Sequence, residues 1–300
     1  MRPDERSDER PDEGAIEHGM VDGSSSGRFR FDGDRAFVDL RQQTDFGPRV
    51  PGTPGHRQCR DWLLAEWESV CGNCRAQDFL AAPRGRPLPM TNILSVLRPE
   101  LPSPVLLCAH WDTRPTADRE PDPSMRRQPI CGANDGASGV AVLLQLARHL
   151  ALDPPPVGVQ FVLFDGEDYG PGRKSMFLGS RHYAAAPVLP RPRFAILLDM
   201  VGRQGLRLRR EYFSERFAPE VNDRLRASAV ALGLPEYIDE IGAAVEDDHL
   251  FLQAIGWPAV ALIDIDDPHW HTLADTPEHC SPRSLAAVGS LLWHLLHQCA

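Results

Sequence analysis

Residues 157–168 read Val-Gly-Val-Gln-Phe-Val-Leu-Phe-Asp-Gly-Glu-Asp, and this stretch decides the fold that we predict. Its apolar first part is rich in branched and aromatic side chains, which is typical of a strand buried on both faces of a sheet. The three acids that follow, Asp165, Glu167 and Asp168, place charge at the end of that strand, where open α/β folds keep their ligand sites. A solvated turn is the other interpretation of these acids, because Asp and Gly are common in turns.

Strands and helices alternate along the rest of the chain. The patterns predict strands at 91–98, 104–109, 157–165, 194–200 and 258–265, with the first two paired, and helices at 35–44, 62–70, 136–150, 218–232, 248–255 and 283–298. Such alternation predicts an α/β fold with a mostly parallel central sheet covered by helices on both faces. We expect one domain over residues 31–300. Residues 1–30 have almost no large apolar side chains, so we predict a disordered segment there.

The bulk composition excludes several function classes. A net charge of −10 argues against nucleic acid as a partner, because phosphate binding needs a basic surface. No apolar run approaches the length of a membrane span. Neither Met1 nor Met20, the two candidate starts, is followed by the apolar core of a signal peptide, so we expect a cytoplasmic protein.

The seven cysteines are scattered and odd in number, which does not indicate a disulfide framework. Cys71 and Cys74 have the spacing of a redox or metal pair, but no second pair accompanies them. We therefore interpret them as thiols at the end of a helix that stops at Gly72.

Acids and histidines gather just after the predicted strands and at helix starts. The residues in these positions are His110, Asp112, Asp135, Glu167, Asp168, Asp199, Asp247, Asp248, His249, His269 and His271. Parallel strands end at one edge of a sheet, so these groups are expected to converge. Carboxylates with imidazoles and no thiolate suit a catalytic zinc ion, for which three protein ligands leave one position open. Singly, each residue could instead be a turn, a helix cap or a satisfied core group.

At this point the chain resembles a known family. The motifs that carry the resemblance are His110-Trp-Asp112, the segment 132–139 around Asp135, Asp165-Gly-Glu167-Asp168, Leu-Leu-Asp199-Met, Asp247-Asp248-His249 and Trp270-His271-Thr. In this order they are similar to those of the zinc aminopeptidase clan, and within it to the bacterial zinc-dependent glutaminyl cyclases. The resemblance covers about residues 33–299.

The resemblance implies a role for each matching residue. One zinc ion is bound by Asp135, Asp168 and His271; Glu167 is the general acid/base; Asp199 and Asp248 form a proton network with it; Trp270 is a wall of the substrate pocket. The implied reaction converts an N-terminal glutaminyl residue of a peptide or protein to pyroglutamate and releases ammonia.

Two alternatives stay open at this stage. A two-zinc aminopeptidase would use His110 and Asp199 for a second metal, with Asp135 bridging, and all three are present. A metal-free binding module on a peptidase scaffold is the other, although such relatives usually lose ligands and this chain keeps them. The acidic pair at 247–248 and Trp270 favour the cyclase. Asp168 is shorter than the glutamate usual at its position, so Glu167 is a second candidate for the metal ligand.

Overall fold

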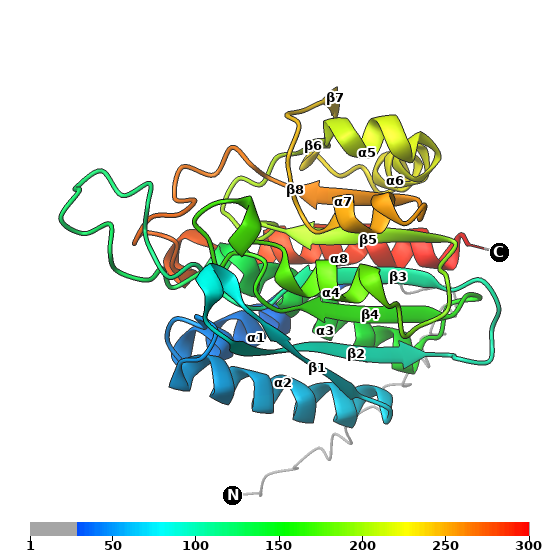
Figure 1. The fold of residues 1–300 in the computed structure, drawn as a ribbon. Helices are drawn as coiled ribbons and strands as arrows, with labels where there is room; N and C mark the ends of the chain where they lie inside the picture. The colour runs from blue at the N-terminus through cyan, green and yellow to red at the C-terminus, as the bar shows by residue number, and fades with distance from the viewer. Residues whose placement is uncertain (1–28, 300) are drawn as a thin grey trace, which may run out of the picture.

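The computed structural model describes residues 29–299, and a six-stranded sheet forms its centre (Figure 1). The strands lie in the order β1-β2-β4-β3-β5-β8. Their bounds are β1 (Arg75–Ala81), β2 (Leu88–Leu97), β3 (Val105–His110), β4 (Val159–Phe164), β5 (Phe194–Asp199) and β8 (Ala259–Ile263). β4, β3, β5 and β8 are parallel, whereas β2 is antiparallel to both β1 and β4. The predicted α/β sheet is confirmed, and β1 and β2 make it mixed.

The predicted pairing of the strands near 91–98 and 104–109 is wrong. β4 lies between β2 and β3, with Leu163 opposite Ile93 on one side and Val159 beside Val105 on the other. The connection over 98–104 contains three prolines, which cannot donate backbone hydrogen bonds. Two strands that are neighbours in sequence are therefore separated by a strand that comes 50 residues later, which apolar runs alone do not reveal.

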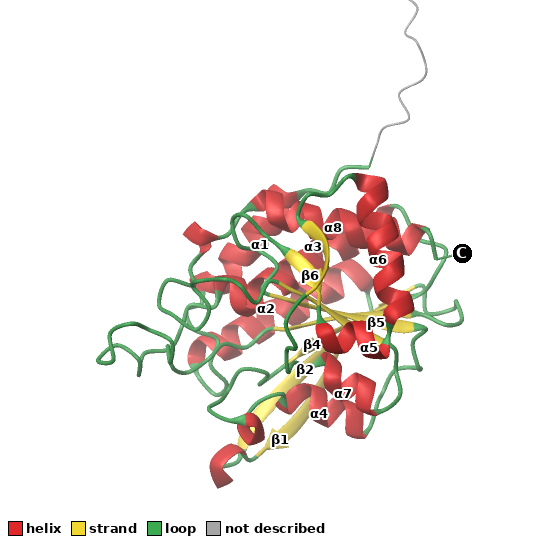
Figure 2. Cartoon of the chain, turned by 90° about the horizontal axis from the view of Figure 1, so that it is seen from above, coloured by secondary structure: helices red, strands yellow, loops and turns green. Residues whose placement is uncertain are grey.

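Helices cover both faces of the sheet, as Figure 2 shows from above. The helices on one face are α1 (Gly33–Asp45), α2 (Pro54–Cys71), α3 (Gly139–Leu152) and α8 (Pro282–His297), with α6 (Pro219–Leu232) against α8. The helices on the other face are α4 (Leu178–Ala185) and α7 (His249–Ala254), and α5 (Tyr212–Phe217) contacts β8. The predicted α/β/α architecture is thus confirmed.

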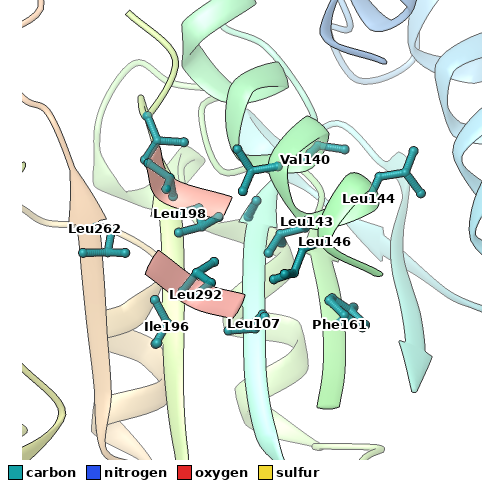
Figure 3. Packing of buried hydrophobic residues seen from close by; sticks show 14 of the residues in the cluster. Leu107, Val140, Leu143, Leu144, Leu146, Phe161, Ile196, Leu198, Leu262 and Leu292 are labelled. Atoms are coloured by element: carbon teal, nitrogen blue, oxygen red, sulfur yellow. The ribbon is translucent and has the colours of Figure 1, made fainter. Parts of the chain in front are cut away.

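Alternate residues of each central strand pack into different cores. Leu107, Phe161 and Ile196 pack against α3 and α8 (Figure 3). Leu106 and Val162, each one residue away, pack on the opposite face with Tyr183 of α4 and Leu252 of α7. Every residue of β4 is buried, which confirms the strand that we predicted from its continuous apolar run.

The sequence patterns did not predict the strands that are short or rich in polar residues. β1 alternates exposed and half-buried residues, and the small parallel sheet of β6 (Leu208–Arg210) and β7 (Tyr237–Ile241) is rich in charge. The helix ends agree better with the sequence, because the predicted stop at Gly72 and the predicted cap at Ser281 are both present. Gly72 ends α2 with φ +67°, and the Ser281 side chain caps α8 by accepting from the backbone N–H of Arg283.

The limits of the described chain leave some predictions untested. Residues 1–28 of the predicted disordered segment lie outside the described residues. Phe29, near the end of that segment, stacks on Trp293, and Phe31, the first residue of the predicted domain, is buried. The domain boundary at residue 31 stays a prediction. Across residues 29–299, no helix combines the length and apolarity needed to cross a membrane. All seven cysteines are free thiols.

Candidate active site

The predicted site residues meet at the edge where the parallel strands end. His110 is the last residue of β3 and Asp199 the last of β5. Glu167 and Asp168 follow β4, and His271 follows β8. Asp135 lies in the irregular turn η2 (Ala133–Ser138) that leads into α3, and all of these side chains are buried. Parallel topology therefore brings together residues that are far apart in sequence.

Three of them form a group that we call the first ligand group: Asp135, Asp168 and His271, whose ligand atoms lie within 4.8 Å of one another. His271 Nε2 is 3.5 Å from Asp135 Oδ2 and 3.4 Å from Asp168 Oδ1. Ligand atoms around a tetrahedral zinc ion are about 3.3 Å apart. Asp135 Oδ2 and Asp168 Oδ2 are buried without a hydrogen-bond partner among the described residues. Such oxygens are costly unless a cation satisfies them, so this group fits a divalent metal.

The second ligand group consists of His110, Asp135 and Asp199, again within 4.8 Å. His110 Nε2 lies 3.1 Å from Asp135 Oδ1 and 3.2 Å from Asp199 Oδ1. Burial opposes a charge on this ring, but contacts with these carboxylates and Asp112 raise the pKa of His110 well above its usual value. The close approach depends on Gly136, because a Cβ there would lie 2.3 Å from His110 Nε2.

The three acids of the loop after β4 have different contacts. Asp165 turns away from the first ligand group: its carboxylate lies 2.9 Å from His56 Nε2 and accepts from the backbone N–H of Thr91. The backbone N–H groups of Glu167 and Asp168 donate to the Asp112 carboxylate over 3.0 and 3.2 Å. Asp165 and Asp112 therefore fix the backbone that presents the other two acids.

Glu167 lies beside the metal-ligand candidates in a buried, acidic environment. Burial raises the pKa of Glu167 well above its usual value, and the charges of Asp168, Asp247 and Asp248 act in the same direction, although His110 opposes them. Glu167 Oε2 is 3.9 Å from His110 Nδ1. A carboxyl group whose pKa is raised toward neutral pH is suited to general acid/base chemistry.

The two acids predicted to share protons with Glu167 have other direct partners. Asp199 contacts His110, and Asp248 accepts from the Ser180 hydroxyl. Burial and then the neighbouring Asp247 raise the pKa of Asp248 well above its usual value. Burial, followed by the charge of Asp199, raises the pKa of Asp247 to about 7. The structure thus links Asp248 to Glu167 through charge.

Trp270 is half-buried next to His271, with ring centroids 4.4 Å apart. The guanidinium of Arg119 lies over the indole, 3.8 Å from its centroid. The backbone N–H of Arg119 also donates to the carbonyl of His271. The ring is therefore held at the side of the first ligand group.

Sequence reasoning missed Arg114 and Asp118, and it did not predict the contact that Asp275 makes with Asp135. Arg114 contacts Asp168 and Asp118, and Asp118 Oδ1 lies 3.2 Å from His271 Nδ1. Asp275 accepts from the backbone N–H of Asp135 over 3.2 Å. Arg114 and Asp118 follow the His110 motif within eight residues, so the motif's continuation into the loop was the available signal.

Comparison with known proteins assigns the family. The profile of peptidase family M28 matches residues 92–296, which is more than half of the chain. The chain belongs to this family. As a member of M28 it is 27% identical over 215 residues to aminopeptidase YwaD of Bacillus subtilis, an alignment that covers 67% of this chain and 43% of the aminopeptidase. The chain spans less than half the length of the curated relatives it matches.

Solved structures match this M28 chain over nearly their whole length. Glutaminyl cyclase from Bacteroides thetaiotaomicron has a TM-score of 0.87 and 35% identity, covering 91% of this chain and 99% of its own. The cyclase from Porphyromonas gingivalis has a TM-score of 0.86 and 37% identity, covering 91% and 100%. A leucine aminopeptidase precursor from Bacteroides thetaiotaomicron has a TM-score of 0.88 and 35% identity, covering 91% and 99%. The predicted resemblance to bacterial glutaminyl cyclases is confirmed.

Proposed function

We propose that this protein is a zinc-dependent glutaminyl-peptide cyclotransferase acting on peptides or proteins with an N-terminal glutamine. The observation that carries the proposal is the contrast between the two ligand groups. The first has buried oxygens that lack partners, whereas His110 Nε2 in the second already contacts both of its carboxylates. One metal beside one buried glutamate is what the cyclisation needs. The glutaminyl cyclases that match 91% of the chain support the same assignment.

The reaction is internal to the substrate. Its α-amine attacks the side-chain amide carbon, a new C–N bond closes the five-membered lactam, and the bond to the amide nitrogen breaks to release ammonia. A zinc ion held by Asp135, Asp168 and His271 supplies Lewis acidity toward the amide oxygen. Because nucleophile and electrophile share one molecule, the protein has mainly to bend the substrate and exclude water.

Glu167 moves the proton that this reaction must transfer. It takes the proton from the attacking amine and delivers it to the departing amide nitrogen, so that ammonia leaves as a neutral molecule. Its burial and the neighbouring acids favour the proton-bearing form that the second half of this transfer requires. The charge of Asp248 raises the pKa of Glu167, and Asp199 contacts His110, the imidazole that opposes this shift.

Trp270 forms a wall of the substrate pocket in this proposal. Its half-buried ring stands beside His271 and offers a flat apolar surface to the methylene groups of the bent glutaminyl side chain. Contact with this ring would replace water around the substrate.

Ammonia release from a glutaminyl dipeptide amide tests the proposal, with hydrolysis of aminoacyl anilides measured in parallel. We expect ammonia and a pyroglutamyl product, loss of the activity with a chelator, and its return with zinc. Anilide hydrolysis without ammonia release would contradict the proposal.

A two-zinc aminopeptidase is the second candidate, because all residues of the second ligand group are present and within reach of one another. The alignments with an aminopeptidase and an aminopeptidase precursor favour it too. An inactive binding module has less support, since both ligand groups are complete among the described residues. Activity that is lost with a chelator and returns with zinc would exclude this third option.

A further inference from the structure

Arg114 links Asp168 and His271, two members of the first ligand group, because it contacts Asp168 directly and His271 through Asp118. Its side chain lies in the loop of residues 111–132, which follows β3 and extends from the body of the molecule in Figure 1. One end of the guanidinium donates through Nη1 to Asp168 Oδ1. The other end donates through Nε and Nη2 to the two oxygens of Asp118, over 3.1 and 2.8 Å. Asp118 Oδ1 in turn lies 3.2 Å from His271 Nδ1.

The backbone after Asp168 is shaped around this guanidinium. A Cβ at Gly170 would lie between 2.7 and 3.0 Å from three guanidinium atoms, and Gly170 has φ +33°. A larger residue at position 170 would therefore have to displace Arg114. Arg114 is only 5% exposed, so its charge is matched by these partners and little by water. The guanidinium is thus buried and closely packed at this edge of the sheet.

We propose that Arg114 is a positioning residue that compensates for the short side chain of Asp168. Asp168 Oδ1, the oxygen 3.4 Å from His271 Nε2, already accepts from the guanidinium, so Oδ2 is the Asp168 oxygen that lacks a donor and is left to a metal. Through Asp118, Arg114 fixes the ring of His271. The inference rests on the proposed metal site. It explains the unpartnered state of Asp168 Oδ2, which is buried beside a carboxylate oxygen that already has its donor. A monodentate carboxylate and an oriented imidazole preserve an open coordination position.

Charge and ligand positioning act in opposite directions on metal affinity when Arg114 is replaced. A guanidinium near a dication is repulsive, but Asp118 pairs with the same guanidinium in a bidentate contact and offsets most of that repulsion. Arg114→Gln removes one positive charge and leaves the Asp118 carboxylate unpaired, which by itself would favour a dication, but it also releases two of the three metal ligands. Removal of outer contacts of this kind weakens metal binding by about 10–100-fold. We expect the loss of ligand positioning to lower zinc affinity by more than the loss of the guanidinium charge raises it.

The test is the zinc dissociation constant, measured by competition with a chromophoric chelator. We expect Arg114→Gln and Asp118→Ala each to weaken zinc binding by about 10–100-fold. The double variant should lose about as much as the worse single variant, because both act through one network. Arg114→Lys, which reaches one carboxylate at a time, should fall in between. The visible spectrum of the cobalt(II)-substituted protein should change in Arg114→Gln, because freed Oδ1 can join the metal.

Arg148 of α3 provides a matched control. It also pairs with two carboxylates, those of Asp39 and Glu66, and is largely buried. Arg148→Gln should lower the melting temperature and leave zinc affinity unchanged. An Arg114→Gln protein with the same lowered melting temperature and wild-type or tighter zinc affinity would overturn the proposal.

Two further outcomes separate this inference from the proposed function. If Arg114→Gln does not fold, Arg114→Lys and Asp118→Ala decide, since Asp118 is partly exposed and tolerates truncation better. A wild-type protein that binds zinc but releases no ammonia refutes the cyclase and leaves the affinity comparison valid. Normal cyclisation with unaltered zinc affinity in all Arg114 and Asp118 variants overturns this inference alone.

Discussion

The two ligand groups share Asp135 and differ in how their atoms are satisfied. Asp135 offers Oδ2 to His271 in the first group and Oδ1 to His110 in the second. In the first group, the imidazole is 3.4–3.5 Å from carboxylate oxygens, and two oxygens have no partner. In the second, the separations are 3.1 and 3.2 Å, and His110 hydrogen-bonds to Asp199.

This difference shows what a list of ligands leaves out. Both groups contain residue types that bind zinc, and both have spacings that tetrahedral coordination accepts. In the second group His110 Nε2 hydrogen-bonds to Asp199 and contacts Asp135. In the first group Asp135 Oδ2 and Asp168 Oδ2 have no hydrogen-bond partner within the described chain, although His271 Nε2 lies 3.5 Å from Asp135 Oδ2. Hydrogen-bond satisfaction therefore favours one metal where ligand identity allows two.

The largest expected effect comes from removing one histidine of each group. His271→Ala should lose its zinc on dialysis and fall to background ammonia release, because it takes a ligand from the first group. His110→Asn should keep about one zinc per chain by elemental analysis. Equal metal loss in both variants would erase the distinction between the groups.

Glu167→Gln tests the acid next to the first group. We expect kcat to fall by about 10²–10⁴-fold, the range typical of general acid/base catalysis, with zinc content unchanged. Loss of zinc in this variant would instead make Glu167 a metal ligand. Asp168→Asn, the neighbouring substitution, serves as the comparison and should lose metal.

Trp270→Ala should act on substrate binding beside the first group. We expect KM to rise by about fivefold with a smaller change in kcat, because one aromatic contact contributes roughly 1 kcal/mol. Trp270→Phe should restore most of the loss. A kcat effect as large as that of Glu167→Gln would place Trp270 in the chemistry rather than in the pocket wall.

Substitution of Glu211 is expected to affect the site least. This buried acid lies 3.2 Å from His249 and outside both ligand groups. Burial opposes its charge, but His249, the Val245 backbone N–H and Ser214 lower the pKa of Glu211 to about 2. Because the folded pKa is below the usual value, its stabilisation is present above about pH 4.5 and is lost toward pH 2. Glu211→Gln should therefore lower the free energy of unfolding by about 2 kcal/mol at neutral pH.

Urea titrations between pH 3 and pH 8 measure this difference. The gap between the wild type and Glu211→Gln should close as the pH falls below 4.5, with zinc content unchanged at neutral pH. A gap that widens in acid would contradict the assigned direction of the pKa shift.

Apolar runs and helix signals predicted the central sheet because β3, β4, β5 and β8 are buried on both faces and end at or directly before a polar residue. They could not predict the order of the strands, since β4 inserts between β2 and β3 through long-range pairing. β1, β6 and β7 carry too much charge to stand out from loops.

The convergence of His110, Asp199 and His271 followed from strand ends, and that of Asp135 from its place at a helix start, because these positions share one edge of a parallel sheet. The supporting contacts did not. Arg114 and Asp118 belong to an irregular loop, where no periodicity says which side chain turns inward. The direction of Asp165 toward His56 likewise depends on tertiary packing. The cytoplasmic location and the disorder of residues 1–30 stay predictions.

Zinc titration of the metal-free protein, with ammonia release from a glutaminyl dipeptide amide read at each step, tests the one-metal account most directly. The account predicts that activity rises linearly and reaches its plateau at one zinc per chain. Activity that continues to rise to two zinc ions per chain, with cleavage of aminoacyl anilides in place of ammonia release, would contradict it.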